Sequence, residues 1–280
     1  MKILVTGANG MVARAAAEFC RSSGDEVIAL DRRSLDISNR DSVIEVVGRN
    51  TPEVIINCAA FTDVDGAESN EIAAYSANSD GPANLAAAAK ACSAKLVTIS
   101  TDYVFDGLFE GFYTEDAAPA PLGVYAKTKY DGELRASQED PDSVIVRSGW
   151  IYGYGGTNFL SVIPELLKAG KHITAISDSF GTPTFAGDLA RRLRELAASD
   201  IRGVVHVTNA GEGSTYYGVA CEIADLLGIE RSRITPISDA DLKRPAPRRL
   251  SSRLATKRLV ELGFDELPDW RDALARFVKA

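Results

Sequence analysis

The chain has 280 residues, of which 45% are hydrophobic and 25% are charged, and its formal net charge is −8. This length and composition suit a globular protein with a substantial core, and they exclude a largely disordered chain. The negative charge argues against nucleic acid as a partner, because binding to a phosphate backbone requires a surplus of lysine and arginine.

The N-terminus and the cysteines favour a cytoplasmic protein. The opening MKILVTG has too short an apolar run for a signal peptide, and no stretch reaches the roughly 18 apolar residues that suggest a membrane span. The cysteines are widely spaced and form neither CxxC pairs nor a disulfide framework. We expect them to be small core residues: Cys20, Cys58, Cys92 and Cys221.

Short apolar runs alternate with longer helical patterns through the first half of the chain. The predicted strands cover residues 2–6, 26–30, 54–57, 95–100 and 143–147. The predicted helices cover residues 11–22, 40–49, 80–92 and 125–137. This alternation is typical of βαβ units, so we predict an α/β fold with a doubly wound parallel sheet of the Rossmann type.

The pattern changes after Trp150. A helix is predicted over residues 158–168, with strands at 173–176 and 204–207. Residues 237–252 contain prolines and several arginines, which indicates a long ordered loop. We expect residues 1–150 to form a dinucleotide-binding domain, with returning segments near 184–206. Residues 151–183 and 207–280 would form a smaller α/β substrate lobe.

The sequence TGANGMVA follows the first predicted strand and opens the first helix. Gly7 and Gly10 leave room for a tight turn and for a pyrophosphate at the helix N-terminus, while Ala13 stands where a third glycine is common. Asp31 closes the second strand and could bind the adenosine ribose, which favours NADH, whereas Arg32 and Arg33 favour NADPH. A solvated cluster of charges is the alternative for these three residues.

Tyr125 and Lys129 lie four residues apart in YAKTK, on one face of the predicted helix. Thr101 lies at the carboxyl end of the fourth predicted strand, where open α/β sheets bind ligands. Thr101 would donate a hydrogen bond to a substrate carbonyl, and Tyr125 would supply a proton. Lys129 would stabilise the phenolate, because a nearby ammonium lowers the pKa of a phenol, and would hold the nicotinamide ribose.

Several motifs together resemble the dTDP-4-dehydrorhamnose reductase family of extended short-chain dehydrogenases/reductases. They are TGANG, NCAAFTDVD, NSDGP, STDYVFDG, VYAKTK, SGWIYG and DSFGTPT, with LPDW near the C-terminus. The resemblance implies a catalytic set of Thr101, Tyr125 and Lys129, which Asn78 steadies. It also implies cofactor contacts at Gly10, Met11, Val12, Asp31, Asp36, Ile37, Ala59, Ala60, Phe61 and Thr62, and sugar contacts at Asp102, Tyr103 and Trp150. Ala13 and Ser148-Gly149 depart from the family pattern.

Histidines and arginines are the remaining candidates for metal and phosphate sites. His172 and His206 lack metal-ligand spacing, so we predict no metal from the sequence, although the resemblance allows Mg²⁺ at the interface of a homodimer. Four arginines near the C-terminus form either a solvated face or a phosphate clamp: Arg244, Arg248, Arg249 and Arg253. We hypothesise that Arg248 binds the substrate diphosphate, because guanidinium matches phosphate bidentately.

The resemblance implies reduction of the C4 ketone of dTDP-4-dehydro-L-rhamnose to dTDP-L-rhamnose by NADPH or NADH. Another NDP-4-keto-6-deoxy sugar is an alternative substrate. A nucleotide-sugar dehydratase is disfavoured because Tyr103 stands where such enzymes carry a glutamate. A non-catalytic subunit, similar to the regulatory subunit of methionine adenosyltransferase, is the alternative from another class.

Overall fold

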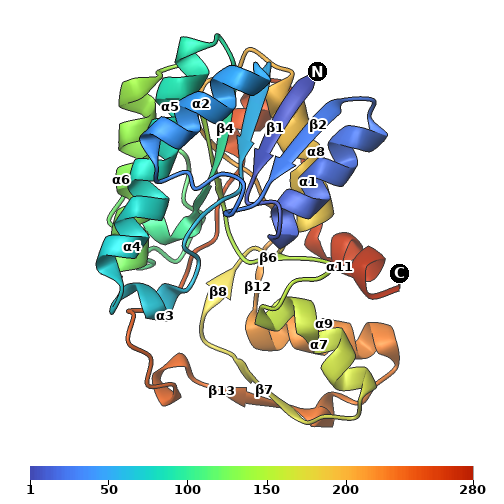
Figure 1. Cartoon of the computed structure of the whole chain (residues 1–280). Coiled ribbons are helices and arrows are strands. Elements are labelled where there is room, and N and C mark those ends of the chain that lie inside the picture. The colour runs from blue at the N-terminus through green and yellow to red at the C-terminus, as the bar shows by residue number, and fades with distance from the viewer. Residues whose placement is uncertain (280) are drawn as a thin grey trace.

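The computed structural model describes residues 1–279, and its centre is a parallel sheet flanked by helices (Figure 1). Within those residues the sheet has six strands in the order β10-β5-β4-β3-β1-β2. The strands are β1 (Lys2–Thr6), β2 (Glu26–Leu30), β3 (Val54–Asn57), β4 (Lys95–Thr101), β5 (Val144–Ser148) and β10 (Gly203–His206). All neighbouring pairs run parallel. The predicted doubly wound fold is therefore confirmed.

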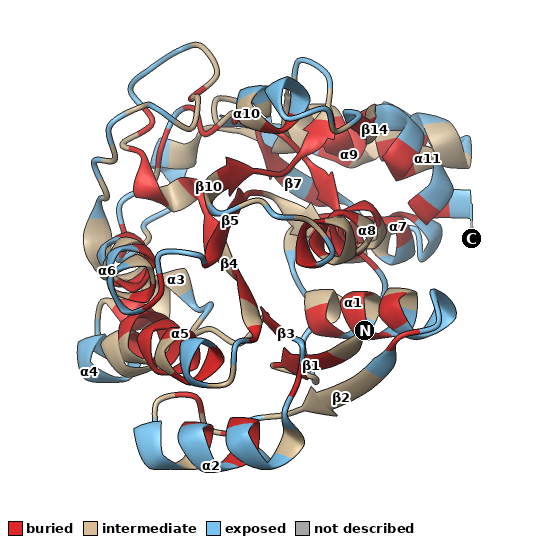
Figure 2. Cartoon of the chain, turned by 90° about the horizontal axis from the view of Figure 1, so that it is seen from above, coloured by how far each residue is buried: buried red, intermediate tan, exposed pale blue. Residues whose placement is uncertain are grey.

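Helices cover both faces of this sheet (Figure 2). One face is covered by α1 (Met11–Ser22) and α8 (Ala186–Ala197). The other is covered by α2 (Arg40–Asn50), α5 (Gly81–Ala91) and α6 (Gly123–Glu139). The short helices α3 (Val64–Ala67) and α4 (Glu71–Tyr75) pack beside α6.

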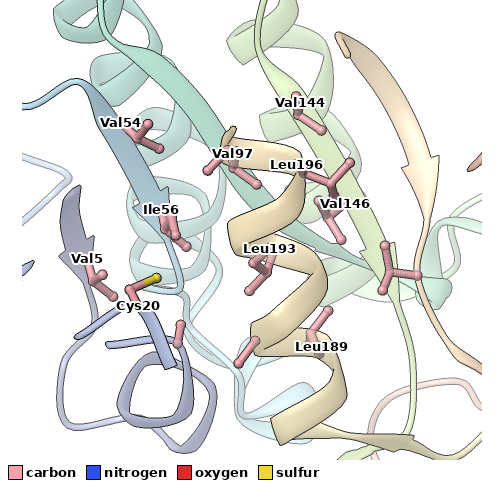
Figure 3. Close-up of a cluster of buried hydrophobic side chains, with 14 of the residues drawn as sticks. Val5, Cys20, Val54, Ile56, Val97, Val144, Val146, Leu189, Leu193 and Leu196 are labelled. Carbon is pink, nitrogen blue, oxygen red and sulfur yellow. The ribbon is translucent and has the colours of Figure 1, made fainter. Parts of the chain in front are cut away.

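Alternate strand residues point to opposite faces, and both faces are apolar. Val5, Ile56, Val97 and Val146 lie in the cluster that includes Leu193 of α8 (Figure 3). Their sequence neighbours on the strands face the other helix layer: Leu4, Ile55, Leu96 and Ile145. Burial on both faces accounts for the nearly continuous Val/Ile/Leu runs from which the strands were predicted.

The later half of the chain builds a second core below the sheet (Figure 1). It contains α7 (Phe159–Lys168), α9 (Tyr216–Leu227), α11 (Trp270–Lys279), and β7 (Ile173–Ile176) paired with β13 (Ile234–Ile237). Shorter elements lie around it: β6 (Ile151–Tyr152), β8 (Phe180–Gly181), β9 (Thr184–Phe185), β11 (Asn209–Ala210), β12 (Ser214–Thr215) and β14 (Leu267–Asp269). Leu259 of α10 (Lys257–Glu261) and Leu267 of β14 pack instead in the core between the main sheet and α1 and α8. The division into a dinucleotide domain and a sugar-nucleotide lobe stays a prediction.

Two expectations from the sequence are wrong in detail. The helix predicted from residue 80 is already helical from Glu71, and α4 continues through a π-helical turn (Ser76–Asp80) into α5. That turn shifts the hydrogen-bond pattern next to Pro82, which has no N–H to donate. Cys20 and Cys221 are buried as expected, but Cys58 and Cys92 are only partly buried.

Candidate active site

A cavity of about 690 Å³ lies at the carboxyl ends of β1, β3, β4 and β5. This volume is in the range of small-molecule sites. The sheet order reverses between β1 and β3, and open α/β sheets bind ligands at such a switch point. The cavity is lined by segments at the ends of these strands, by α6, and by residues of the second core: Asn9–Arg14, Cys58–Ala60, Thr62, Ile99–Tyr103, Tyr125, Lys129, Ser148–Ile151, Gly155–Leu160 and Tyr216.

The turn after β1 forms one end of the cavity. Gly7 has φ = +72°, and a Cβ there would lie 2.9 Å from the backbone N and Cα of Ala59. Gly10 is the N-cap of α1 and donates to the Gly7 carbonyl at 2.8 Å, and no side chain caps this helix. The N–H groups that open α1 therefore have no side-chain acceptor at the N-cap, and Gly10, Met11 and Val12 line the cavity. They suit the pyrophosphate of a dinucleotide.

Asp31 lies just beyond this turn, at the end of β2. One carboxylate oxygen accepts hydrogen bonds from the Ser34 N–H at 3.0 Å and hydroxyl at 2.9 Å. The other oxygen accepts from the Asn9 amide at 3.2 Å, and Asn9 lines the cavity. The hydrogen bonds from Ser34 hold the pKa of Asp31 below its usual range. Asp31 is thus an ionised acceptor beside the cavity, as binding to ribose hydroxyls requires.

Tyr125 of α6 and Thr101 at the end of β4 face the same cavity. Burial raises the pKa of the Tyr125 phenol to about 12, and the nearby Thr101 hydroxyl opposes this rise. The Thr101 hydroxyl donates to Asp102 Oδ1 at 3.2 Å and accepts from the Tyr103 N–H at 3.2 Å. The phenol is therefore protonated near neutral pH, which is the state needed to give a proton to a substrate oxygen.

Lys129 lies one helical turn after Tyr125 and is buried. Its ammonium donates to the Ile99 carbonyl at 2.7 Å, and burial lowers its pKa to about 8. Asn78 donates to the hydroxyl of Thr128, next to Lys129 in sequence, and bonds both backbone groups of Phe61. Asn78 thus connects the segment after β3 to α6 at the residue before Lys129.

Aromatic side chains form the other end of the cavity. Trp150 stacks on Tyr216 of α9, with 3.8 Å between ring centroids, and has φ = +49°. Residues other than glycine rarely adopt this left-handed backbone conformation, and such backbone strain concentrates at functional sites. Tyr103 meets Tyr125 edge to face, with centroids 5.3 Å apart. This end offers flat apolar faces next to the phenol that carries the proton.

Two neighbouring arginines take different positions at this end. Arg248 pairs with Asp65 at 2.8 Å. Arg249 is buried, with its guanidinium 3.4 Å above the Tyr103 ring and 3.5 Å from Asp102 Oδ2. Arg249 therefore lies against residues that line the cavity, whereas Arg248 is held by Asp65.

Comparison with known proteins identifies the family. The model of the RmlD substrate binding domain matches residues 1–280. A dTDP-4-dehydrorhamnose reductase of Streptomyces griseus is 39% identical over 97% of this chain and 91% of its own length. This chain belongs to the RmlD family.

Two further relatives add detail. The dTDP-4-keto-6-deoxy-D-glucose reductase of Streptomyces niveus is 38% identical over 96% of this chain and 90% of its own length. The solved dTDP-4-dehydrorhamnose reductase of Bacillus anthracis, in complex with NADP, has a TM-score of 0.94 and 34% identity over 99% of each chain. The likeness extends over both cores of the molecule.

Most residues that the sequence predicted for an RmlD-family site lie together. The cavity is lined by Gly10, Met11, Val12, Ala59, Ala60, Thr62, Thr101, Asp102, Tyr103, Tyr125, Lys129 and Trp150. Gly7 is not part of the lining but packs against the backbone of Ala59, which is. Six other predicted contact residues lie outside the lining: Asp31, Arg32, Asp36, Ile37, Phe61 and Arg248. Arg32 is 3.6 Å from Asp36, and Ile37 is buried against Gly81. The predicted roles of all these residues stay predictions.

Sequence reasoning missed Tyr216 and Arg249. Tyr216 comes from α9, a helix that was not predicted, and no local motif marks it. Arg249 belongs to the noted arginine cluster, but spacing alone does not distinguish it from Arg248.

A magnesium site finds no support in this RmlD-family chain. Among residues 1–279, no group of three or more His, Cys, Asp or Glu side chains is placed to hold a metal ion. His206 is buried, its Nδ1 lies 3.0 Å from the Ala255 carbonyl oxygen, and burial lowers its pKa to about 3. In the same part of the chain, no helix is both long enough and apolar enough to cross a membrane.

Proposed function

We propose that this protein is a cytoplasmic enzyme that uses NADPH or NADH to reduce the C4 ketone of a dTDP-4-keto-6-deoxy sugar. The favoured substrate is dTDP-4-dehydro-L-rhamnose, which would give dTDP-L-rhamnose for nucleotide-sugar biosynthesis. One observation carries the proposal: Thr101, Tyr125 and Lys129 line the same cavity as the dinucleotide turn at Gly10–Val12. The names of the reductases to which the chain is similar support the choice of substrate.

The dinucleotide would lie along the turn after β1, with its pyrophosphate at the N-terminus of α1. Asp31 would accept hydrogen bonds from the adenosine ribose, and Ala59, Ala60 and Thr62 would contact the cofactor after β3. When bound, the reduced nicotinamide supplies the hydride for the sugar C4 carbon.

The protein's own residues would deliver the proton to the C4 oxygen. Thr101 would donate a hydrogen bond to the C4 oxygen, and Tyr125, protonated because burial raises the pKa of its phenol, would transfer a proton to that oxygen. The Lys129 ammonium would stabilise the phenolate left behind and hold the nicotinamide ribose. Trp150, Asp102 and Tyr103 would contact the sugar.

The nucleotide diphosphate needs a cation. Arg248 is our candidate, and its ion pair with Asp65 shows that the side chain is held in a defined position. Binding of a diphosphate there would require Arg248 to share its guanidinium between Asp65 and the phosphate.

Two other functions are disfavoured by particular residues. A dehydratase needs an acid/base pair next to Thr101, but the side chains that follow are Asp102, which is buried, and Tyr103, which packs under Arg249. A purely binding subunit does not need a protonated phenol and a buried ammonium facing one cavity.

The test is an absorbance assay at the reduced-nicotinamide band, with enzymatically prepared dTDP-4-keto sugars and either NADH or NADPH. We expect substrate-dependent loss of absorbance, fastest with dTDP-4-dehydro-L-rhamnose. Cofactor binding without turnover of any keto sugar would favour the binding subunit, and turnover of dTDP-glucose without added reductant would favour the dehydratase.

A further inference from the structure

A buried ion pair lies behind the proposed catalytic residues, and the reaction described above does not use it. Glu133 of α6 and Arg147 of β5 each have side chains that are only 4% exposed, and Arg147 Nη2 lies 2.6 Å from Glu133 Oε2. Arg147 Nε lies 3.0 and 3.1 Å from the two carboxylate oxygens. The Ser100 hydroxyl also donates to Glu133. We call Ser100, Glu133 and Arg147 the Glu133 network.

The network lies directly beside the reacting groups. Tyr125, Lys129 and Glu133 are spaced four residues apart, so they share one face of α6. Ser100 and Arg147 are register partners on the adjacent strands β4 and β5.

Two side chains of α6 are bonded to consecutive residues of β4. Lys129 donates to the carbonyl of Ile99, and Glu133 accepts from the side chain of Ser100. Thr101 is the next residue of that strand. The bonds therefore set the position of α6, with its phenol and ammonium, relative to the Thr101 hydroxyl.

Stability alone does not account for this arrangement. Removing two charges from water is costly, and an apolar pair of similar volume often stabilises a core as well or better. One nitrogen of the pair, Arg147 Nη1, is buried and has no hydrogen-bond partner within residues 1–279. The network therefore keeps the charged Arg147 guanidinium buried beside the site, and this burial costs free energy of folding.

We propose that Glu133, held by Arg147 and Ser100, is a positioning residue for the reduction: it fixes α6 against β4 and supplies the negative charge that keeps Lys129 protonated. The inference rests on the proposed function, because Lys129 must be charged to stabilise the phenolate.

The charges around Lys129 agree with this role. Burial lowers the pKa of Lys129, and the Glu133 carboxylate is the largest influence that raises it. Cys58 is the other neighbour, but burial raises the pKa of its thiol to about 12, so it is uncharged near neutral pH.

The titratable groups around Lys129 come from several elements: Tyr125 and Glu133 on α6, Cys58 after β3, Arg147 on β5, and Asp102 and Tyr103 after β4. Most charged groups of other elements packed on α6 are engaged with other partners: Asp80 with Arg135, Glu68 with the Val124 N–H, Lys90 with the Glu139 carbonyl, Asp65 with Arg248 and Lys95 with the Ser199 carbonyl. Glu71 of α4 is exposed to solvent.

The proposal predicts opposite effects from the two halves of the ion pair. Glu133→Gln removes the negative charge, so the pKa of Lys129 should fall by about 1 unit. Arg147→Met removes a positive charge from the same region, so that pKa should rise. The measurement is an NMR titration of protein labelled with ¹³C at the lysine ε carbons, with the Lys129 signal assigned from a Lys129→Met variant. It requires no substrate.

Activity gives the second readout. In Glu133→Gln the fall of kcat/KM at alkaline pH should begin about 1 pH unit lower than in the unchanged protein, because Lys129 loses its proton earlier. At neutral pH we expect kcat to fall about 10-fold or more, with KM for the sugar nucleotide within 2-fold, because misplaced reacting groups lower the rate without removing a substrate contact.

Two further variants separate positioning from stability. Glu133→Met with Arg147→Met leaves no unpaired charge and should fold, yet kcat and the pKa of Lys129 should both remain below those of the unchanged protein. Asp25→Asn breaks another ion pair with one buried partner, Asp25–Arg194 at the opposite edge of the sheet, and should lower Tm while kcat and the pH profile stay unchanged.

A Lys129 pKa that is the same in the unchanged protein, Glu133→Gln and the double variant would overturn the proposal, whether or not a substrate is known. A double variant with full kcat would overturn it as well. Failure of the unchanged protein to reduce any dTDP-4-keto sugar would instead count against the proposed function, and the titration would still decide the role of Glu133 in keeping Lys129 charged.

Discussion

The end of the cavity where we propose that the cofactor binds (the cofactor end) is made largely of backbone, whereas the end where we propose that the sugar binds (the sugar end) is made of side chains. At the cofactor end, Gly7, Gly10 and Ala59 bring main chain together after β1 and β3. At the sugar end, Trp150 and Tyr216 stack across segments that are far apart in sequence. An end made of closely packed backbone tolerates few substitutions, because an added side chain would collide with the neighbouring main chain. A wall of side chains can be altered residue by residue, so we expect substrate choice to reside there.

Between the two ends lies Tyr125, the proposed proton donor, and its replacement should have the largest effect. Tyr125→Phe removes the hydroxyl while keeping the ring that packs on Tyr103. We expect kcat to fall by about 10²–10⁴-fold, the usual contribution of a general acid, with cofactor affinity unchanged. Nicotinamide fluorescence would measure binding, and the absorbance assay would measure kcat. Full activity in this variant would mean that another group supplies the proton.

The sugar end can be tested through Arg248. Loss of a charged hydrogen bond to the diphosphate costs about 1.5–3 kcal/mol, so Arg248→Ala should raise KM for the sugar nucleotide about 10–100-fold. The cofactor KM should not change. Arg253→Ala is a control in the same loop, since Arg253 lies over the rings of Phe112 and Phe180. An unchanged KM in Arg248→Ala would remove Arg248 from the site.

The cofactor end can be tested by adding one methyl group. Gly7→Ala would place a Cβ 2.9 Å from the Ala59 backbone in a left-handed conformation, so the turn must open. We expect NADPH affinity to fall about 10-fold or more, because left-handed strain alone costs about 1–2 kcal/mol before the contact is counted. The matched control is Gly24→Ala, where φ is +85° but no atom lies within 4 Å. Equal affinity in both variants would contradict a role for this backbone packing in cofactor binding.

Asp31 should have the smallest effect, on the choice between cofactors. Its hydrogen bonds keep the carboxylate ionised, and a carboxylate there repels a 2′-phosphate. Asp31→Asn should therefore raise the ratio of kcat/KM for NADPH over that for NADH by several-fold, up to about 10-fold. Parallel assays with both cofactors give this ratio. An unchanged ratio would show that the ribose is recognised elsewhere.

The contrast between the backbone end and the side-chain end also explains how much of the site could be predicted from the sequence. The strand ends, the glycine turn and the spacing of Tyr125 and Lys129 are local patterns, so their positions followed from periodicity and from the rule that parallel strands present ligands at their carboxyl ends. The resemblance to a family supplied the roles.

The stacking of Trp150 on Tyr216 depends on tertiary packing. It brings together a turn after β5 and a helix that begins 66 residues after Trp150. The choice between Arg248 and Arg249 is of the same kind, because only the path of the loop decides which guanidinium lies over Tyr103. No local spacing encodes these contacts.

The convergence of the Thr101 hydroxyl and the Tyr125 phenol on one substrate oxygen is tested most directly by a crystal structure with NADP⁺ and dTDP-L-rhamnose. We expect the sugar C4 oxygen within about 3 Å of both Tyr125 Oη and Thr101 Oγ, with the ring against Trp150. A C4 oxygen directed away from both hydroxyls, in a complex with both ligands bound, would contradict the proposed mechanism.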